Sequence, residues 1–312
     1  MTEFEPGTKQ LAPQPVTAEP RTVADHEAGQ PPRLVQALRT FAANRLAVSG
    51  AVIVVLLVLF CFIGPLFYHT NQINTNLAQA HLAPFTDGHP LGTDELGRDV
   101  LGQLMVGGQV SIEVGFASAA LATLLGTAVG AISGYFGGIV DALLMRIVDA
   151  MLSIPFIFVL IILAVLIHPS RITMIAFIAA TYWPGPARLV RGETLSLRTR
   201  EYVAAVKVAG GRSSRAVLRH ILPNAIGTII VQATFAVADA IIILSSLGFL
   251  GFGIQPPQTD WGSMLSNGLQ YMTLGYWWLI YPAGILIILT CIAFNFIGDA
   301  LRDAFETRLQ RR

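Results

Sequence analysis

The chain has 312 residues, of which 54% are hydrophobic and only 12% are Asp, Glu, Lys or Arg. Soluble domains contain about 25% charged residues, so this composition excludes an ordinary soluble protein and indicates several membrane crossings. The formal net charge of +1 supplies no overall positive field for a nucleic-acid partner. The two cysteines, Cys61 and Cys291, lie in apolar runs and are typical of free buried thiols.

The N-terminal part precedes the first apolar run. Residues 1–32 are rich in Pro, Glu, Thr and Gln, which predicts a disordered cytoplasmic tail. Residues 33–46 place arginines and apolar side chains on opposite helical faces, which predicts an amphipathic lead-in helix at the membrane surface. The alternative is that these residues are simply the polar start of the first span.

Six apolar segments follow, and each approaches the roughly 20 residues that a helix needs to cross the hydrocarbon. They predict transmembrane helices near 47–68, 112–134, 143–167, 172–192, 225–247 and 278–298. The predicted fold class is therefore an all-α integral membrane protein with six transmembrane helices. An extracytoplasmic loop at 69–111 separates the first span from a core of five spans over residues 112–298.

The placement of Lys and Arg predicts the orientation. Three arginines precede the first span, so the N-terminus is expected inside. With six spans, the loop at 193–224 and the tail at 299–312 are also inside, and both are rich in basic residues. The predicted outside segments contain only Arg98 and Arg171. Both termini are therefore expected to be cytoplasmic.

The inner loop, residues 193–224, contains a polar and basic stretch between two apolar segments. Ala204 and Ala205 contribute to a smooth helical face, Gly210-Gly211 breaks that helix, and a second helix is expected from Ser213 to Pro223. A short helix–turn–helix outside the bilayer predicts a docking element for a separate energy-supplying subunit. The alternative is a basic loop that only sets the topology.

The outer loop contains the segment HPLGTDELGRD, from His89 to Asp99. Its glycines and proline predict turns, and its charged residues can pair with one another. A metal site formed by His89, Asp94 and Asp99 is the alternative. It is disfavoured because no second histidine lies at ligand spacing.

Glycines recur every four residues in and after the second predicted span, at Gly126, Gly130, Gly134 and Gly138. On one helix they would form a groove that allows close approach of a neighbouring backbone. This pattern indicates helix packing rather than chemistry.

Ionisable residues near or inside the spans are the first functional suspects. Arg146 and Asp149 are three residues apart and are expected to pair on one helix face. Asp239 lies in the middle of a span and must face the bundle interior or an aqueous cavity. It is a candidate for the substrate path, where it would contact an amine of the ligand. The alternative is that it only satisfies a neighbouring helix.

Several catalytic motifs are absent from the sequence. It contains no Gly-x-x-x-x-Gly-Lys-Ser/Thr phosphate loop, no His-Glu-x-x-His, no Cys-x-x-Cys and no Gly-x-Ser-x-Gly. We therefore assign no catalytic residue, no metal ligand and no bound cofactor. Uphill transport would draw its energy from an ion gradient or from a partner.

The inner loop resembles the EAA motif of ABC importer permeases. The matching positions are Ala204, Ala205, Val206, Gly210 and Ile221-Leu222-Pro223, with Ala204 in place of the motif's glutamate and Val206 in place of its second alanine. Other segments look like the C-type permease of dipeptide and oligopeptide importers, namely His89–Asp99, Gly134–Gly138, Arg219–Asn224, Phe249–Gly251, Gln255–Pro257 and Gly298–Asp303. The resemblance covers about residues 33–308.

This resemblance implies a type I ABC importer permease fold in the cytoplasmic membrane, surrounded by lipid. It implies a homologous second permease, two ATP-binding subunits that hold ATP and Mg²⁺, and an extracytoplasmic solute-binding protein. The coupling loop would contact the ATPase through Glu201, Tyr202, Ala204, Ala205, Lys207, Gly210, Gly211, Arg212 and Pro223.

Peptides are the substrate class that the resemblance implies, with nickel or another small solute as the alternative. Two hypotheses come from other classes, an ion-coupled carrier that works alone and an integral-membrane enzyme. A carrier would favour inverted repeats and several deep charges, whereas no internal repeat is visible and only Asp239 is deep. An enzyme would need a catalytic constellation that the sequence lacks.

Overall fold

The computed structural model describes residues 41–69 and 74–306. Within these ranges the chain forms helices joined by turns, and pairing between extended residues is limited to two isolated bridges. The predicted tail at 1–32, the first part of the predicted lead-in helix at 33–46 and the last residues of the predicted tail at 299–312 lie outside the described residues.

The first span is a helix from Arg45 to Phe67. It consists of α2 (Arg45–Val58), the π-helical η2 (Leu59–Ile63) and α3 (Gly64–Phe67). The side chain of Asn44 caps the N-terminus of α2 by accepting hydrogen bonds from the backbone N–H groups of Leu46 and Ala47. This helix packs along the last helix, α13 (Tyr281–Glu306). A Cβ on Gly50 would lie 2.7 Å from the carbonyl oxygen of Ala293, so the two backbones are nearly in contact.

The second span, α4 (Val100–Phe136), begins earlier than the predicted 112, and the outer loop therefore ends at Asp99 rather than 111. The Asp99 side chain caps the helix by accepting from the N–H of Gly102 at 2.7 Å. The outer turns of α4 pack against protein, because the indole N–H of Trp261 donates to the carbonyl of Leu104 at 2.9 Å. Such turns need not be as apolar as a lipid-facing segment.

The predicted third span at 143–167 is wrong as a single helix. The segment forms α5 (Gly138–Ser153) and α6 (Phe156–Leu166), which are bent by 81° at their junction. Pro155 lies at this junction, and it lacks the N–H that a continuous helix would need. Gly137 separates α4 from α5 at φ +66°, so Gly138 belongs to α5 and is not part of a glycine face on α4.

The predicted fourth span at 172–192 is also divided. It forms the short helix α7 (Arg171–Tyr182) and the helix α8 (Pro184–Leu197), with Trp183 between them. Ser170 and Thr173 form a capping box that begins α7. Proline is well accommodated in the first turn of a helix, so a new helix begins at Pro184.

After α8 the chain forms α9 (Glu201–Val208) and then one continuous helix from Ser213 to Phe249. This helix consists of α10 (Ser213–Ala216), η4 (Val217–Ile221) and α11 (Leu222–Phe249). The second helix of the inner loop therefore does not end at the predicted Pro223. In the π-helical η4, the N–H of Leu222 bonds to the carbonyl of Val217. This wider turn accommodates the missing N–H of Pro223 without a break.

The C-terminal part contains α12 (Trp261–Leu269), the short η5 (Met272–Leu274) and η6 (Trp277–Leu279), and α13. The last helix continues past the predicted boundary at 298 to Glu306. Among the described residues, four helices are long and apolar enough to cross a membrane, and the α5–α6 pair makes a fifth if it is one broken span. The six predicted straight spans are therefore not all present as such.

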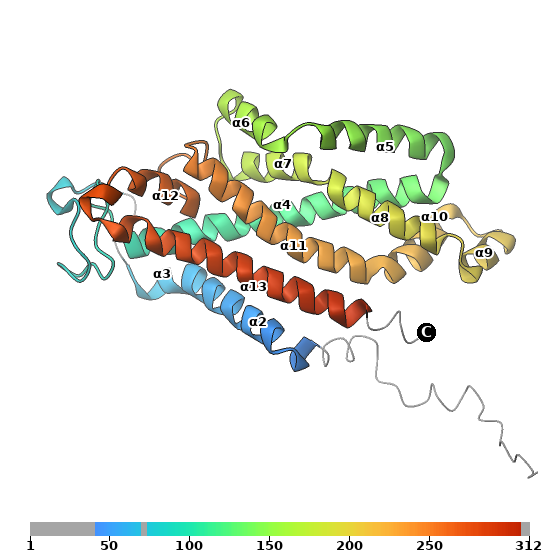
Figure 1. Ribbon diagram of the computed structural model, residues 1–312, viewed down its shortest axis with the longest axis horizontal. Coiled ribbons are helices and arrows are strands. Elements are labelled where there is room, and N and C mark those ends of the chain that lie inside the picture. Colours follow the sequence, from blue (N-terminus) through green and yellow to red (C-terminus); the bar gives the residue numbers. More distant parts are fainter. Residues whose placement is uncertain (1–40, 70–73, 307–312) are drawn as a thin grey trace, which may run out of the picture.

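The long helices run lengthwise beside one another (Figure 1). α4 lies at the centre and packs on α8, α11 and α7. α2 and α13 form the side of the bundle that lies opposite α5 and α6. The helices α9 and α10 are at one end of the molecule, and α12 is at the other end with the loop that precedes α4 (Figure 1). Fully buried apolar side chains from α4, α6, α7 and α11 fill the centre, including Val110, Leu160, Met174 and Leu244.

Candidate coupling site and translocation path

The helix α9 has one face against the bundle and one face exposed. Val203 is fully buried in a cluster with Tyr135 of α4, Ala216 of α10 and Ile221 of η4. Glu201, Tyr202, Ala204 and Ala205 are exposed, and the side chain of Lys207 lies outside the described part of the chain. The short helix α9 is therefore held to the bundle by its buried face, and its small and polar residues are exposed on the other face.

The turn after α9 favours glycine at two positions for different reasons. Gly210 has φ +74°, which disfavours any residue with a Cβ. The N–H of Gly211 bonds to the carbonyl of Val206 at 2.8 Å, as in a Schellman motif. A Cβ on Gly211 would lie 2.6 Å from a methyl carbon of Val206. The two glycines therefore set the angle between α9 and α10.

A basic groove lies beside this turn. It has a volume of about 510 Å³ and is lined by Gly210, Gly211, Arg212, Ser214, Arg215, Leu218 and Arg219. Three guanidinium groups on one groove favour an acidic partner surface. Pro223 is exposed but lies beyond this groove, within the continuous helix.

The helix that leads into the inner loop, α8, is held against α4 by close backbone contact. A Cβ on Gly126 would lie 2.6 Å from the Cβ of Pro186, and one on Gly130 would lie 2.4 Å from the carbonyl oxygen of Ala187. A Cβ on Gly134 would lie 2.7 Å from the Cβ of Thr194, whereas a Cβ on Gly138 would meet no neighbouring helix within 4 Å. The groove on α4 is therefore formed without Gly138, because the helix ends before it.

Replacing Gly130 with alanine is expected to destabilise the protein by about 1–3 kcal/mol, the usual cost of overpacking. The added methyl group would meet the backbone of α8, which cannot rotate away as a side chain could. Thermal unfolding of the purified protein in detergent measures this effect. Gly192→Ala on α8 is the matched control, since a Cβ there meets nothing within 4 Å. Equal midpoints for the two variants would contradict the prediction.

Ion pairs connect α8 to α5. Arg191 donates to both carboxylate oxygens of Asp141, at 2.5 and 2.6 Å, and Ser133 also bonds to this carboxylate. Arg188 lies 2.5 Å from Asp149. The predicted pair of Arg146 with Asp149 is therefore wrong, because the neighbouring helix offers Asp149 a guanidinium across the interface.

Asp239 lies half-buried in α11 and accepts a hydrogen bond from the hydroxyl of Tyr182, at the end of α7. Within the described residues, no Lys, Arg or His forms an ion pair with it. The neighbouring helix thus supplies one hydrogen-bond partner for the Asp239 carboxylate. This contact is the one expected if Asp239 only satisfies a neighbouring helix. The sequence alone did not indicate Tyr182, because these two residues are 57 positions apart.

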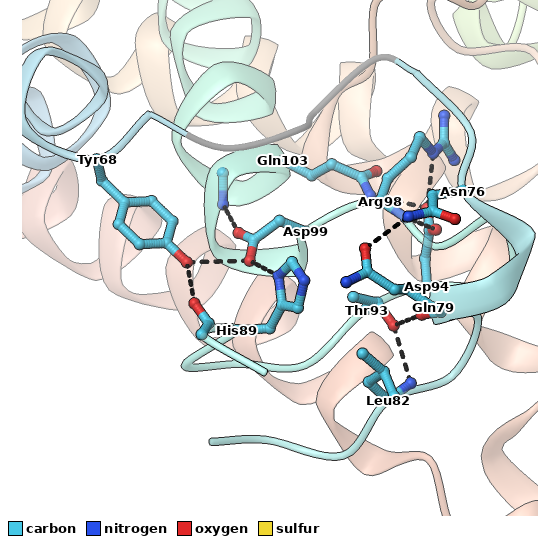
Figure 2. Close-up of polar contacts among 12 residues, drawn as sticks. Tyr68, Asn76, Gln79, Leu82, His89, Thr93, Asp94, Arg98, Asp99 and Gln103 are labelled. Atoms are coloured by element: carbon cyan, nitrogen blue, oxygen red, sulfur yellow. Dashed lines mark hydrogen bonds and ion pairs between the residues drawn. The ribbon is translucent and has the colours of Figure 1, made fainter. Parts of the chain in front are cut away.

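Polar contacts hold the outer loop together, and two of the networks that they form are centred on aspartates (Figure 2). In the first, the Asp99 carboxylate lies 2.6 Å from His89 Nδ1 and accepts from the Tyr68 hydroxyl at 3.0 Å. Burial and the Asp99 charge raise the pKa of Tyr68, which keeps this hydroxyl a donor. In the second, Asp94 accepts from Arg98 Nε at 2.8 Å and from Gln103 at 2.7 Å.

These two networks do not converge on a metal site. Asp94 faces Arg98 and Gln103, whereas His89 and Asp99 face each other. No group of three or more His, Cys, Asp or Glu residues in the described ranges could hold a metal ion.

Sequence reasoning missed the polar cap of α12. Asp260 is fully buried and accepts from the N–H and hydroxyl of Ser263, at 3.0 and 2.7 Å, and from the N–H of Ile254 at 3.1 Å. Burial raises the pKa of Asp260, and these hydrogen bonds oppose that shift. An Asp followed three residues later by Ser, at the start of an apolar run, is an N-cap signal that could have revealed this site.

The bundle therefore has a helix with one exposed face at one end and a buried polar cap at the other. The family model described as "Binding-protein-dependent transport system inner membrane component" matches residues 126–311. The model for the N-terminal transmembrane domain of oligopeptide transport permease C matches residues 33–84. The chain belongs to this family of inner-membrane transport components, and it is an inner-membrane protein.

Relatives extend the match over most of the chain. The oligopeptide transport system permease protein OppC of Bacillus subtilis is 40% identical over 88% of this chain and 90% of its own length. The dipeptide transport system permease protein DppC of the same organism is 39% identical, over 88% of this chain and 86% of its own length. OppC of Escherichia coli is 40% identical over 87% of this chain and 90% of its own length.

Proposed function

We propose that the chain is the C-type permease subunit of an ATP-driven importer that moves dipeptides or oligopeptides across the cytoplasmic membrane. The observation that carries this proposal is the similarity, over 88% of the chain, to permeases named for oligopeptide and dipeptide transport. The inner loop supports it, because α9 is anchored on one face and free on the other.

The partners in this proposal are a homologous second permease, two ATP-binding subunits and an extracytoplasmic solute-binding protein. ATP and Mg²⁺ bind to the ATP-binding subunits, which perform the hydrolysis. α9 and the Gly210-Gly211 turn form the coupling element, with the inner loop on the cytoplasmic side. The basic groove with Arg212, Arg215 and Arg219 supports this assignment, since it favours an acidic surface on a partner.

Movement of the ATP-binding subunits would reach the spans through two rigid connections. α9 contacts η4, which is continuous with α11, and α8 packs on α4 without space for a methyl group at Gly130. A displacement of α9 would therefore move both α11 and the α8–α4 pair as bodies, as in rigid-body switching between two states. Asp239 lies on α11 and is the proposed contact to the substrate path.

Reconstitution of the complete assembly in proteoliposomes tests the proposed function. Uptake of labelled dipeptides and oligopeptides is expected to require ATP, the ATP-binding subunits and the binding protein, and to be absent when any of them is omitted. Uptake by this chain alone, driven by an imposed proton or sodium gradient, would contradict the proposal. In that case Asp239 would become the residue to study, because a carrier needs a deep ionisable group.

A further inference from the structure

The outer loop presents an aromatic residue in an unusual conformation. Phe85 has φ +65° and is 88% exposed. Left-handed backbone is unfavourable for bulky residues, and such strained positions cluster at functional sites. The nearby Asp87 also has a positive φ, of 47°. A ring that is almost fully exposed gives the isolated chain little burial energy to offset this strain.

The turn that carries Phe85 is nevertheless well ordered by hydrogen bonds. The N–H of Phe85 donates to the carbonyl of His89, and the N–H of His89 donates to the carbonyl of Thr86, both at 2.9 Å. Thr86 and His89 also form an isolated bridge. The exposed ring is therefore held on a tight turn rather than on a loose chain.

This turn is fixed to the start of α4. His89 Nδ1 lies 2.6 Å from Asp99, which is itself fully buried and caps α4 through the N–H of Gly102 (Figure 2). The Tyr68 hydroxyl joins the same carboxylate and lies 3.3 Å from the carbonyl oxygen of Gly88 (Figure 2). A force on the turn would therefore reach the long central helix directly.

The chemistry of the turn favours a protein partner over a lipid surface. Asp87 and Gly88 are exposed beside Phe85, so inserting the ring into a bilayer would bring a polar carboxyl side chain and exposed backbone with it. A pocket on a protein can accept the ring and offer a basic group to Asp87 at its rim. Rigid aromatic side chains that enter pockets carry much of the energy of such interfaces.

We propose that Phe85 is the anchor through which the extracytoplasmic binding protein docks on this permease, with Asp87 facing a basic group on that protein. This inference rests on the proposed function. Docking at Phe85 acts on α4 through His89 and Asp99. α4 in turn packs on α8, which is the helix that leads into the inner loop.

Titration of the intact assembly with its peptide-loaded binding protein tests this proposal. ATP hydrolysis is measured against binding-protein concentration, in lipid nanodiscs and in detergent. Phe85→Ala is expected to raise the half-saturating concentration by at least about tenfold, as for a hot-spot residue. Leu77→Ala is the matched control, because Leu77 is 72% exposed in the same loop. It is expected to leave the titration unchanged.

Phe85→Gly separates docking from folding. Glycine relieves the strain at φ +65°, so this variant is expected to lose docking as Phe85→Ala does, with an unfolding midpoint no lower than that of the wild type. An unchanged half-saturating concentration for Phe85→Ala would overturn the proposal. A defect seen only in nanodiscs would overturn it in favour of a lipid anchor.

Two further outcomes bear on the fold and on the proposed function. A clear loss of thermal stability in Phe85→Gly would overturn the proposal, because it would show that the ring stabilises the fold. If binding protein does not stimulate hydrolysis in the wild-type assembly, the proposed function itself fails, and the docking proposal fails with it. A docking failure alone leaves ATP-driven uptake intact in the wild type, so the two results are distinguishable.

Discussion

Replacing Gly210 with proline is expected to abolish ATP-driven uptake while the helical bundle still folds. Proline holds φ near −65°, whereas Gly210 has φ +74° and connects α9 to α10 in a tight turn. The substitution would change the direction of α9 relative to the bundle. The exposed face of α9 would then no longer be in position to contact the ATP-binding subunit. Peptide uptake and ATP hydrolysis in proteoliposomes measure this effect. ATP hydrolysis is expected to be no longer stimulated by peptide.

The control for this prediction is Gly210→Asn. Asparagine adopts the left-handed region more readily than other residues with a Cβ, and the space around Gly210 is open, since a Cβ there meets nothing within 4 Å. This variant is expected to retain most of the uptake. Normal uptake in Gly210→Pro would mean that the turn is not the coupling element, even if the assembly proves to be an ATP-driven importer.

Replacing Trp261 with alanine is expected to produce the largest loss of stability, about 3–5 kcal/mol, as for other buried aromatic residues. Trp261, the first residue of α12, is fully buried against α4. Its indole N–H donates to the carbonyl of Leu104 at 2.9 Å, and its backbone N–H donates to the hydroxyl of Ser111 at 3.2 Å. The variant would leave a cavity and remove the indole contact, so the midpoint of thermal unfolding by circular dichroism is expected to fall sharply.

Trp277→Ala provides the comparison, because Trp277 is 48% exposed at the same end of the molecule. Its loss is expected to shift the midpoint far less, since an exposed ring contributes little burial. A similar shift for both tryptophans would show that the stability of this end does not depend on burial at Trp261.

The elements that could be predicted from the sequence depend on local signals. The first, fifth and sixth apolar segments coincide with long helices, because about 20 apolar residues must form a helix in hydrocarbon. The helix α9 and its Gly210-Gly211 end were likewise readable, since small residues at helical spacing and paired glycines act within a few residues. The family resemblance also rested on short local motifs.

The differences arise where distant segments meet. The extra turns of α4 are stabilised by burial against Trp261, and hydropathy alone did not include them in the span. Pro223 does not end the helix because η4 adopts π geometry there, whereas Pro155 lies at a bend of 81°. The residue type is the same at both positions, so the surrounding helix and its packing decided the outcome.

The sequence by itself determined that this chain is a helical membrane protein with a basic loop at residues 193–224, since composition and hydropathy are properties of single segments. Only the tertiary structure decided that Asp149 pairs with Arg188, that Asp239 bonds to Tyr182, and that Gly138 lies outside the α4 groove. These partners are far apart in the chain, and their meeting depends on how the helices pack. Contacts of this kind fix the positions of the helices relative to one another.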